Sequence, residues 1–185
     1  MNRPPDLRIR RIPMLTRAEG EGARQSAVID PTGRYRYSLI REWASGPWAC
    51  WIMLNPSTAD AEVDDPTIRR CVGFSRSWGF DGLEVVNLFA FRTSDPRRLK
   101  VVEDPVGPDN DKAILRATAR ASQIIAAWGS LGLWRGRGAE VLSLLGCLPV
   151  FALTVSHRTG QPGHPLYLPS TIVPRTVLQA AAAPR

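Results

Sequence analysis

The chain has 185 residues, 44% of them hydrophobic, so it is long enough to form one domain with a sizeable core. No apolar run approaches the roughly 20 residues of a membrane-spanning helix, and the N-terminus lacks the apolar centre of a signal peptide. The three cysteines are far apart without a CxxC pair, which indicates neither a disulfide framework nor a zinc knuckle and favours a cytoplasmic protein.

The net charge is +7, and the positive excess lies on the flanks of the chain. Residues 1–48 hold nine arginines against five acids, and residues 133–185 hold five against one. The stretch between them holds ten basic and eleven acidic residues. Arginine suits phosphate recognition, although an arginine-rich composition also reflects a GC-rich genome. The charge therefore favours a nucleic-acid partner without establishing one.

A β-hairpin is predicted near the N-terminus. Residues 1–23 mix Arg, Pro, Gly and Glu without periodicity and indicate an arm. The β-rich runs 26–29 and 35–40 flank a Pro/Gly turn, which predicts a hairpin over about 25–43. From residue 24 onward, up to 185, we expect a single domain.

Strand and helix patterns alternate through the rest of the chain. Such alternation implies right-handed crossovers, so we expect a three-layer α/β/α sandwich with a mainly parallel four-stranded core, preceded by the hairpin. No GxGxxG or GxxxxGK[ST] phosphate loop is present, and we expect no cofactor. The predicted strands are 48–54, 83–89, 123–129 and 149–155, and the predicted helices are about 65–79, 109–121, 135–145 and 170–181.

Polar or small residues stand where these strands end. The first strand stops at Asn55, because the proline that follows cannot extend a central strand. The second ends near Asn87 and the third at Gly129, while the loop after the fourth holds His164. The carboxyl ends of parallel strands share one edge, where ligands bind. We therefore expect these side chains to line one pocket.

Six stretches carry a family resemblance: 54–60, 65–71, 87–90, 104–108, 127–129 and 164–168. Through them, the chain over about 34–169 resembles the bacterial and phage family known as domain of unknown function 1643. That family carries no assigned function, so the resemblance implies membership alone.

The order and spacing of the four strand ends is also similar to the uracil-DNA glycosylase superfamily. This resemblance implies that Asn55 positions the attacking water, that Asn87 reads the edge of a pyrimidine, and that His164 stabilises the oxygen of the leaving base. The chain departs from that pattern in three places, one of which is the stretch 65–71, because it has no counterpart there. Ser57 stands where the mismatch-specific branch has Gly, and the loop after Pro165 lacks the serine-rich wedge of the uracil-specific branch.

The resemblance describes coherent chemistry. Cleavage of an N-glycosidic bond builds negative charge on the leaving base, which a neutral His164 can stabilise as an oxyanion donor. The amide of Asn55 can position water, although it is a poor general base. A flipped base needs a pocket with aromatic walls, such as Phe89 or Trp128. We therefore predict a DNA glycosylase-like hydrolase without a metal, with the monomer favoured. The expected base-binding residues are Pro56, Ser57, Asn87, Phe89, Gly129 and Pro165, and the expected contacts to the nucleic-acid backbone are Arg34, Arg36 and Arg158.

Other interpretations remain open. Asp60, Asp64 and Asp65 lie close enough in sequence to bind Mg²⁺ and act on nucleotides or other phosphates. Asp65 is equally explained as a helix cap. A non-catalytic nucleic-acid-binding protein would use the arginine-rich flanks alone. His164 would then be a loop histidine bonded to backbone, and Trp128 a core residue.

Overall fold

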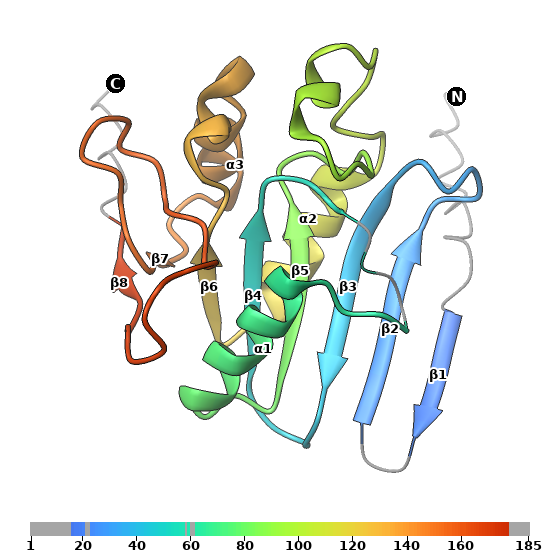
Figure 1. The fold of residues 1–185 in the computed structure, drawn as a ribbon, viewed down its shortest axis with the longest axis vertical. Helices are drawn as coiled ribbons and strands as arrows, with labels where there is room; N and C mark the ends of the chain where they lie inside the picture. The colour runs from blue at the N-terminus through green and yellow to red at the C-terminus, as the bar shows by residue number, and fades with distance from the viewer. Residues whose placement is uncertain (1–15, 21–22, 58, 60–61, 178–185) are drawn as a thin grey trace, which may run out of the picture.

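The computed structural model describes residues 16–20, 23–57, 59 and 62–177. A single mixed sheet of eight strands runs through this part of the chain, in the order β1-β2-β3-β5-β4-β6-β7-β8 (Figure 1). The strands are β1 (Thr16–Gly20), β2 (Ala23–Ile29), β3 (Arg36–Glu42), β4 (Trp48–Met53), β5 (Gly82–Asn87), β6 (Gln123–Ala126), β7 (Val150–Ala152) and β8 (Arg175–Thr176).

Four strands in the middle of the sheet are parallel. β4 pairs in parallel with β5 on one side and with β6 on the other, and β6 pairs in parallel with β7. This confirms the expected parallel four-stranded core, which is part of a larger sheet. Since the crossovers place all four carboxyl ends on one edge, residues distant in sequence meet there.

The predicted hairpin is confirmed and joins the same sheet. β2 and β3 pair antiparallel, and β3 continues antiparallel onto β5. Part of the expected arm, residues 16–20, forms β1 and pairs antiparallel with β2. Residues 1–15 of that arm lie outside the described residues.

Helices cover both faces of the sheet. α1 (Pro66–Ser77) lies on one face, and α2 (Asn110–Arg120) and α3 (Arg137–Leu145) lie on the other (Figure 1). Alternation along β4 explains this, because Trp51 packs in a cluster with the apolar residues of α1, whereas Ile52 packs with those of α2 and α3. Two 3₁₀ helices, η1 (Pro96–Lys100) and η2 (Ser130–Gly136), complete the described helices. Within the described residues, none of these helices has the length and apolar character needed to cross a membrane.

The prediction of a helix over 170–181 is wrong for the residues of this range that the structure describes. Residues 175–176 form β8 instead, which pairs antiparallel with β7. Pro174 explains the error, because proline lacks the N–H of a helix interior and disfavours helical backbone at Val173. Residues 178–181 lie outside the described residues.

Candidate functional site

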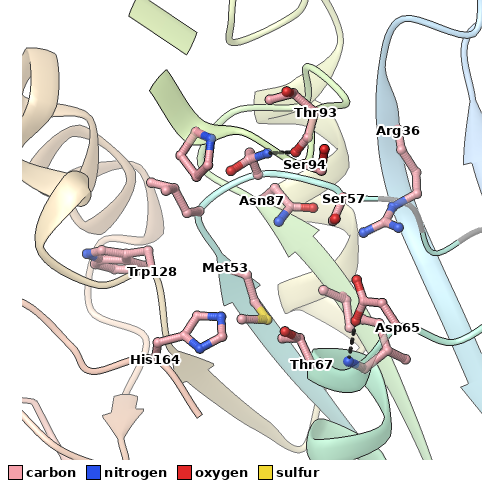
Figure 2. A pocket seen from close by; sticks show the side chains of 15 residues that line it. Arg36, Met53, Ser57, Asp65, Thr67, Asn87, Thr93, Ser94, Trp128 and His164 are labelled. Atoms are coloured by element: carbon pink, nitrogen blue, oxygen red, sulfur yellow. Dashed lines mark hydrogen bonds between the residues drawn. The ribbon is translucent and has the colours of Figure 1, made fainter. Parts of the chain in front are cut away.

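A cavity of about 190 Å³ lies at the carboxyl edge of the central strands (Figure 2). Asn55 follows β4, Asn87 ends β5, and His164 lies in the loop after β7, and all three line this cavity. Three residues from separate strand ends therefore meet at one cavity, as the topology of a parallel sheet predicts. Other lining residues are Arg36, Met53, Ser57, Asp65, Thr67 and Trp128.

Asn55 is tied to the loop opposite by its amide nitrogen. Its Nδ2 donates to the carbonyl of Thr93 at 2.8 Å and to that of Pro56 at 3.0 Å. Both N–H groups of the amide are therefore used within the protein. The carbonyl oxygen is the group of Asn55 that remains to accept a hydrogen bond from water or a ligand.

Asn87 presents a buried amide to the cavity. The residue is only 2% exposed, and within the described residues its Oδ1 has no hydrogen-bond partner. Leaving a buried acceptor unsatisfied costs about 1–3 kcal/mol. Because Asn87 also lines the cavity, its side-chain amide is suited to recognising the polar edge of a ligand.

His164 is held in one tautomer. The backbone N–H of Leu166 donates to Nδ1 at 3.3 Å, so the neutral ring carries its proton on Nε2. Although the side chain is solvent-accessible, burial by the surrounding groups lowers its pKa below 6.5, and the carboxylate of Asp65 opposes this shift only in part. The ring is therefore neutral at pH 7 and offers Nε2–H as a donor. Figure 2 shows it facing Met53 across the cavity.

The first turn of α1 supplies a charged wall. Asp65 Oδ1 accepts from the backbone N–H of Ile68 at 2.8 Å, so Asp65 is the N-cap of α1, as one of the two interpretations held. Thr67 lines the cavity one position into the helix. The carboxylate is thus fixed in place beside the pocket.

Arg36 and Trp128 complete the lining. Arg36 is 2% exposed, its Nη1 donates to the carbonyl of Ala59, and Figure 2 shows its guanidinium turned toward Ser57. Trp128 is 2% exposed, and its Nε1 donates to Gln161 Oε1 at 2.8 Å. The sequence predicts Arg36 as a contact to the nucleic-acid backbone. It does not indicate that Arg36 lines the pocket, since arginine in a β-rich run normally faces solvent.

A family model described as "Protein of unknown function (DUF1643)" matches residues 36–166. The chain belongs to this family. The match begins at Arg36 and extends past His164, so every lining residue of the cavity falls within it. Comparison with the curated proteins and with the solved structures finds no match.

Two further residues of the predicted base site in this DUF1643 chain form backbone hydrogen bonds that hold the loops around the cavity. The backbone N–H of Gly129, which has φ +72°, donates to the carbonyl of Pro162 at 2.8 Å and so anchors the loop that carries His164. Pro56 is buried, and its carbonyl accepts from the N–H of Thr93 at 2.9 Å. Neither is among the described lining residues.

The other expected site residues lie elsewhere. Phe89 is fully buried, with its ring centroid 5.2 Å from that of Trp134, so it belongs to the core beneath α2 and α3. Pro165 is buried beside His164 but is not among the described lining residues. Arg34 and Arg158 are exposed and likewise outside that lining.

The aspartates considered for a metal have other contacts. Asp64 pairs with Arg41 at 2.7 Å, and the Arg41 side chain is only 4% exposed. Asp65 caps α1, and Asp60 lies outside the described residues. Among the described residues, no group of three His, Cys, Asp or Glu side chains gathers as a metal site.

Proposed function

We propose that the cavity takes a single pyrimidine base extruded from DNA and that the protein hydrolyses its N-glycosidic bond. One observation carries this proposal: the buried Asn87 amide, with its unsatisfied Oδ1, lines the same cavity as the Nε2–H donor of a neutral His164. Together they offer a side-chain amide to the polar edge of one base and a ring N–H donor to its oxygen. The similarity of the strand ends to the uracil-DNA glycosylase superfamily supports the same reaction.

Each lining group has a role in the proposed reaction. The carbonyl oxygen of Asn55 accepts a hydrogen bond from a water, which attacks the anomeric carbon of the sugar. The bond between that carbon and the base nitrogen breaks, and its electron pair leaves with the base. The negative charge spreads to the base oxygen, where His164 Nε2–H stabilises it, and the proton that the attacking water loses reaches the departing base through solvent.

The charged walls fit the changes in charge during this reaction. Positive charge builds on the sugar as the base leaves, and the carboxylate of Asp65 lies at the cavity to stabilise it. Arg36 is suited to the phosphate that flanks an extruded nucleotide, because its guanidinium is a fork of donors. Trp128 supplies an aromatic wall for the base.

The test is a glycosylase screen with the full chain. The substrates are oligonucleotides that carry uracil, mismatched thymine, hydroxymethyluracil or bulky modified pyrimidines, and strand cleavage at abasic sites by alkali reports base release. We expect release from at least one of them, and His164→Ala to slow it by on the order of 10²-fold. The matched control is His157→Ala, since His157 is an exposed histidine outside the described lining.

Two results would contradict the proposal. One is release of no base from any substrate. The other is a loss of activity that is equal in His164→Ala and His157→Ala. If chelators stop the reaction and Asp60→Asn with Asp64→Asn abolishes it, a metal-dependent phosphate chemistry takes the place of the glycosylase.

A further inference from the structure

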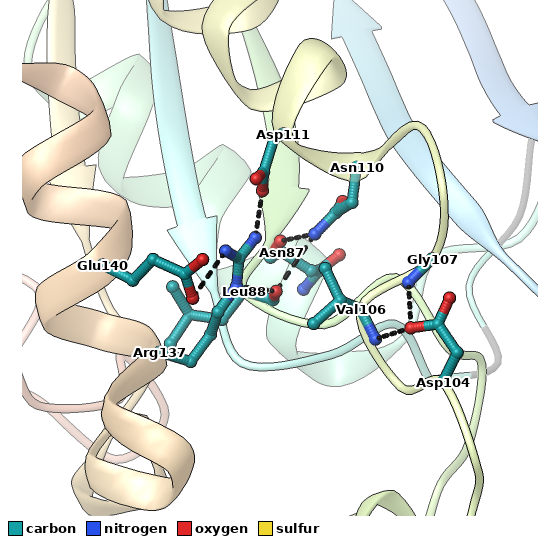
Figure 3. A network of polar contacts seen from close by, with 9 residues as sticks. All are labelled: Asn87, Leu88, Asp104, Val106, Gly107, Asn110, Asp111, Arg137 and Glu140. Atoms are coloured by element: carbon teal, nitrogen blue, oxygen red, sulfur yellow. Dashed lines mark hydrogen bonds and ion pairs between the residues drawn. The ribbon is translucent and has the colours of Figure 1, made fainter.

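The stretch 104–110 forms a tight turn that leads into α2. Asp104 Oδ1 accepts from the backbone N–H groups of Val106 and Gly107, both at 3.0 Å (Figure 3). Gly107 has φ +87°, and a Cβ there would lie 2.9 Å from the ring of Tyr35, so glycine is required on both grounds. The turn places Asn110, the first residue of α2, next to Asn87 at the end of β5 (Figure 3).

Two fully buried polar side chains meet the backbone at the end of β5. Asn110 is 0% exposed, and its Nδ2 donates to the carbonyls of Asn87 at 2.9 Å and Leu88 at 3.0 Å. Arg137, from α3, is 2% exposed, and its Nε donates to the carbonyl of Leu88 at 3.0 Å. Three side-chain hydrogen bonds therefore converge on two successive carbonyls.

Side chains, and not neighbouring strands, donate the hydrogen bonds to these two carbonyls. On one side of β5, the pairing with β3 ends at Val85, before these two carbonyls. On the other side, β4 uses a backbone N–H group at this end of the strand, because the N–H of Leu88 donates to the carbonyl of Met53. Buried carbonyls without a partner would cost about 1–3 kcal/mol each. Asn110 and Arg137 remove that cost and fix the backbone at Asn87.

Arg137 is itself held in place by carboxylates. Its guanidinium pairs with Asp111 of α2 and with Glu140 of α3, the latter at 3.1 Å (Figure 3). Both carboxylates are partly exposed, so each keeps some contact with water while it neutralises the buried cation. The guanidinium thus joins α2, α3 and the end of β5 at one point.

We infer that Asn110 and Arg137 are positioning residues for Asn87. They hold the carbonyls at and after Asn87, and so direct its amide into the cavity at a fixed angle. In the proposed reaction, this angle sets which pyrimidine edge the amide accepts. That part of the inference rests on the proposed function, whereas the control of the Asn87 side chain does not.

The test uses the full chain labelled with ¹⁵N-asparagine. The sequence has four asparagines, Asn2, Asn55, Asn87 and Asn110, so each side-chain amide signal can be assigned by substitution. The variants are Asn110→Ser and Arg137→Lys. The matched control is Arg120→Ala, which breaks the ion pair of α2 with Glu84 on β5, in the half of that strand away from Asn87.

We expect the Asn87 side-chain signals to shift or broaden in Asn110→Ser and Arg137→Lys but to stay in place in Arg120→Ala, whatever the urea midpoints of the three variants. Asn87 signals at the wild-type position in both folded variants overturn the inference. If either variant does not fold, Glu140→Gln, which removes one partner of Arg137, is measured in the same way, and an unchanged signal there has the same meaning.

The activity arm separates the two proposals. On a substrate that the wild type cleaves, kcat should fall about 10- to 100-fold in the two variants, as expected from a displaced contact group, and the preference between two pyrimidines should change. An unchanged preference with shifted Asn87 signals overturns the link to selectivity. If the wild type releases no base, the proposed function fails, while the spectra still decide the positioning.

Discussion

Gly132→Ala should destabilise the protein and displace one wall of the cavity. A Cβ at residue 132 would lie 2.1 Å from Trp128 Cδ1 and 2.4 Å from Nε1, and the indole is only 2% exposed. The ring must move, and this overpacking costs about 1–3 kcal/mol. If the movement also breaks the hydrogen bond of Nε1 to Gln161, a buried donor is left unsatisfied at a cost of about 1–3 kcal/mol more. The expected loss in the free energy of unfolding is therefore about 1–3 kcal/mol if this hydrogen bond survives and about 2–6 kcal/mol if it breaks.

Urea unfolding followed by circular dichroism measures this loss. The matched control is Gly73→Ala in α1, where a Cβ meets nothing within 4 Å and no positive φ is required. That change should stabilise the protein by about 0.5–1 kcal/mol, since alanine is the better helix former. Equal stability of Gly132→Ala and the wild type would refute the description of Trp128 as a tightly enclosed wall, and base release by a stable Gly132→Ala at the wild-type rate would refute its role in the pocket.

Four further predictions concern charge and recognition. Burial lowers the pKa of His164 in the folded protein below 6.5, so the neutral ring stabilises the fold fully above about pH 6.5, and this stabilisation is lost as the pH falls through the folded pKa. Asp65→Asn should lower the pKa of His164 further, because the carboxylate of Asp65 raises it, and NMR titration of the ring measures this change. Asn87→Asp should change which base is released in the oligonucleotide screen, because an amide donor becomes an acceptor, and an unchanged preference would argue against base reading. DNA affinity should fall steeply with salt, with a smaller slope in Arg34→Glu, and a flat dependence in fluorescence anisotropy would favour a small-molecule substrate. Asp64→Asn should lower the free energy of unfolding by about 1–3 kcal/mol, because Arg41 loses a charged partner, but should leave turnover unchanged, and a parallel loss of turnover would favour the metal interpretation.

Local patterns in the sequence were enough to predict the four parallel strands, the three α-helices between them and the edge of the sheet where the cavity lies. The apolar run of β4 ends at Asn55 because proline cannot continue a central strand, and Asp65 followed by proline marks the start of α1. Strands alternating with helices bring their carboxyl ends to one edge, so the meeting of Asn55, Asn87 and His164 follows from topology.

Only the tertiary structure decided which polar side chains are buried and what they hold. Arg137 reaches the carbonyl of Leu88 across 49 positions of sequence, and no periodicity marks either residue for that contact. Arg36 enters the pocket wall because β3 joins the sheet beside β5, a pairing that its own sequence does not specify. At the C-terminal end, the pairing of β8 with β7 prevailed over the expected helix. Propensity and hydrophobic period act within a few residues, whereas the burial of a charge depends on partners that folding brings from distant parts of the chain.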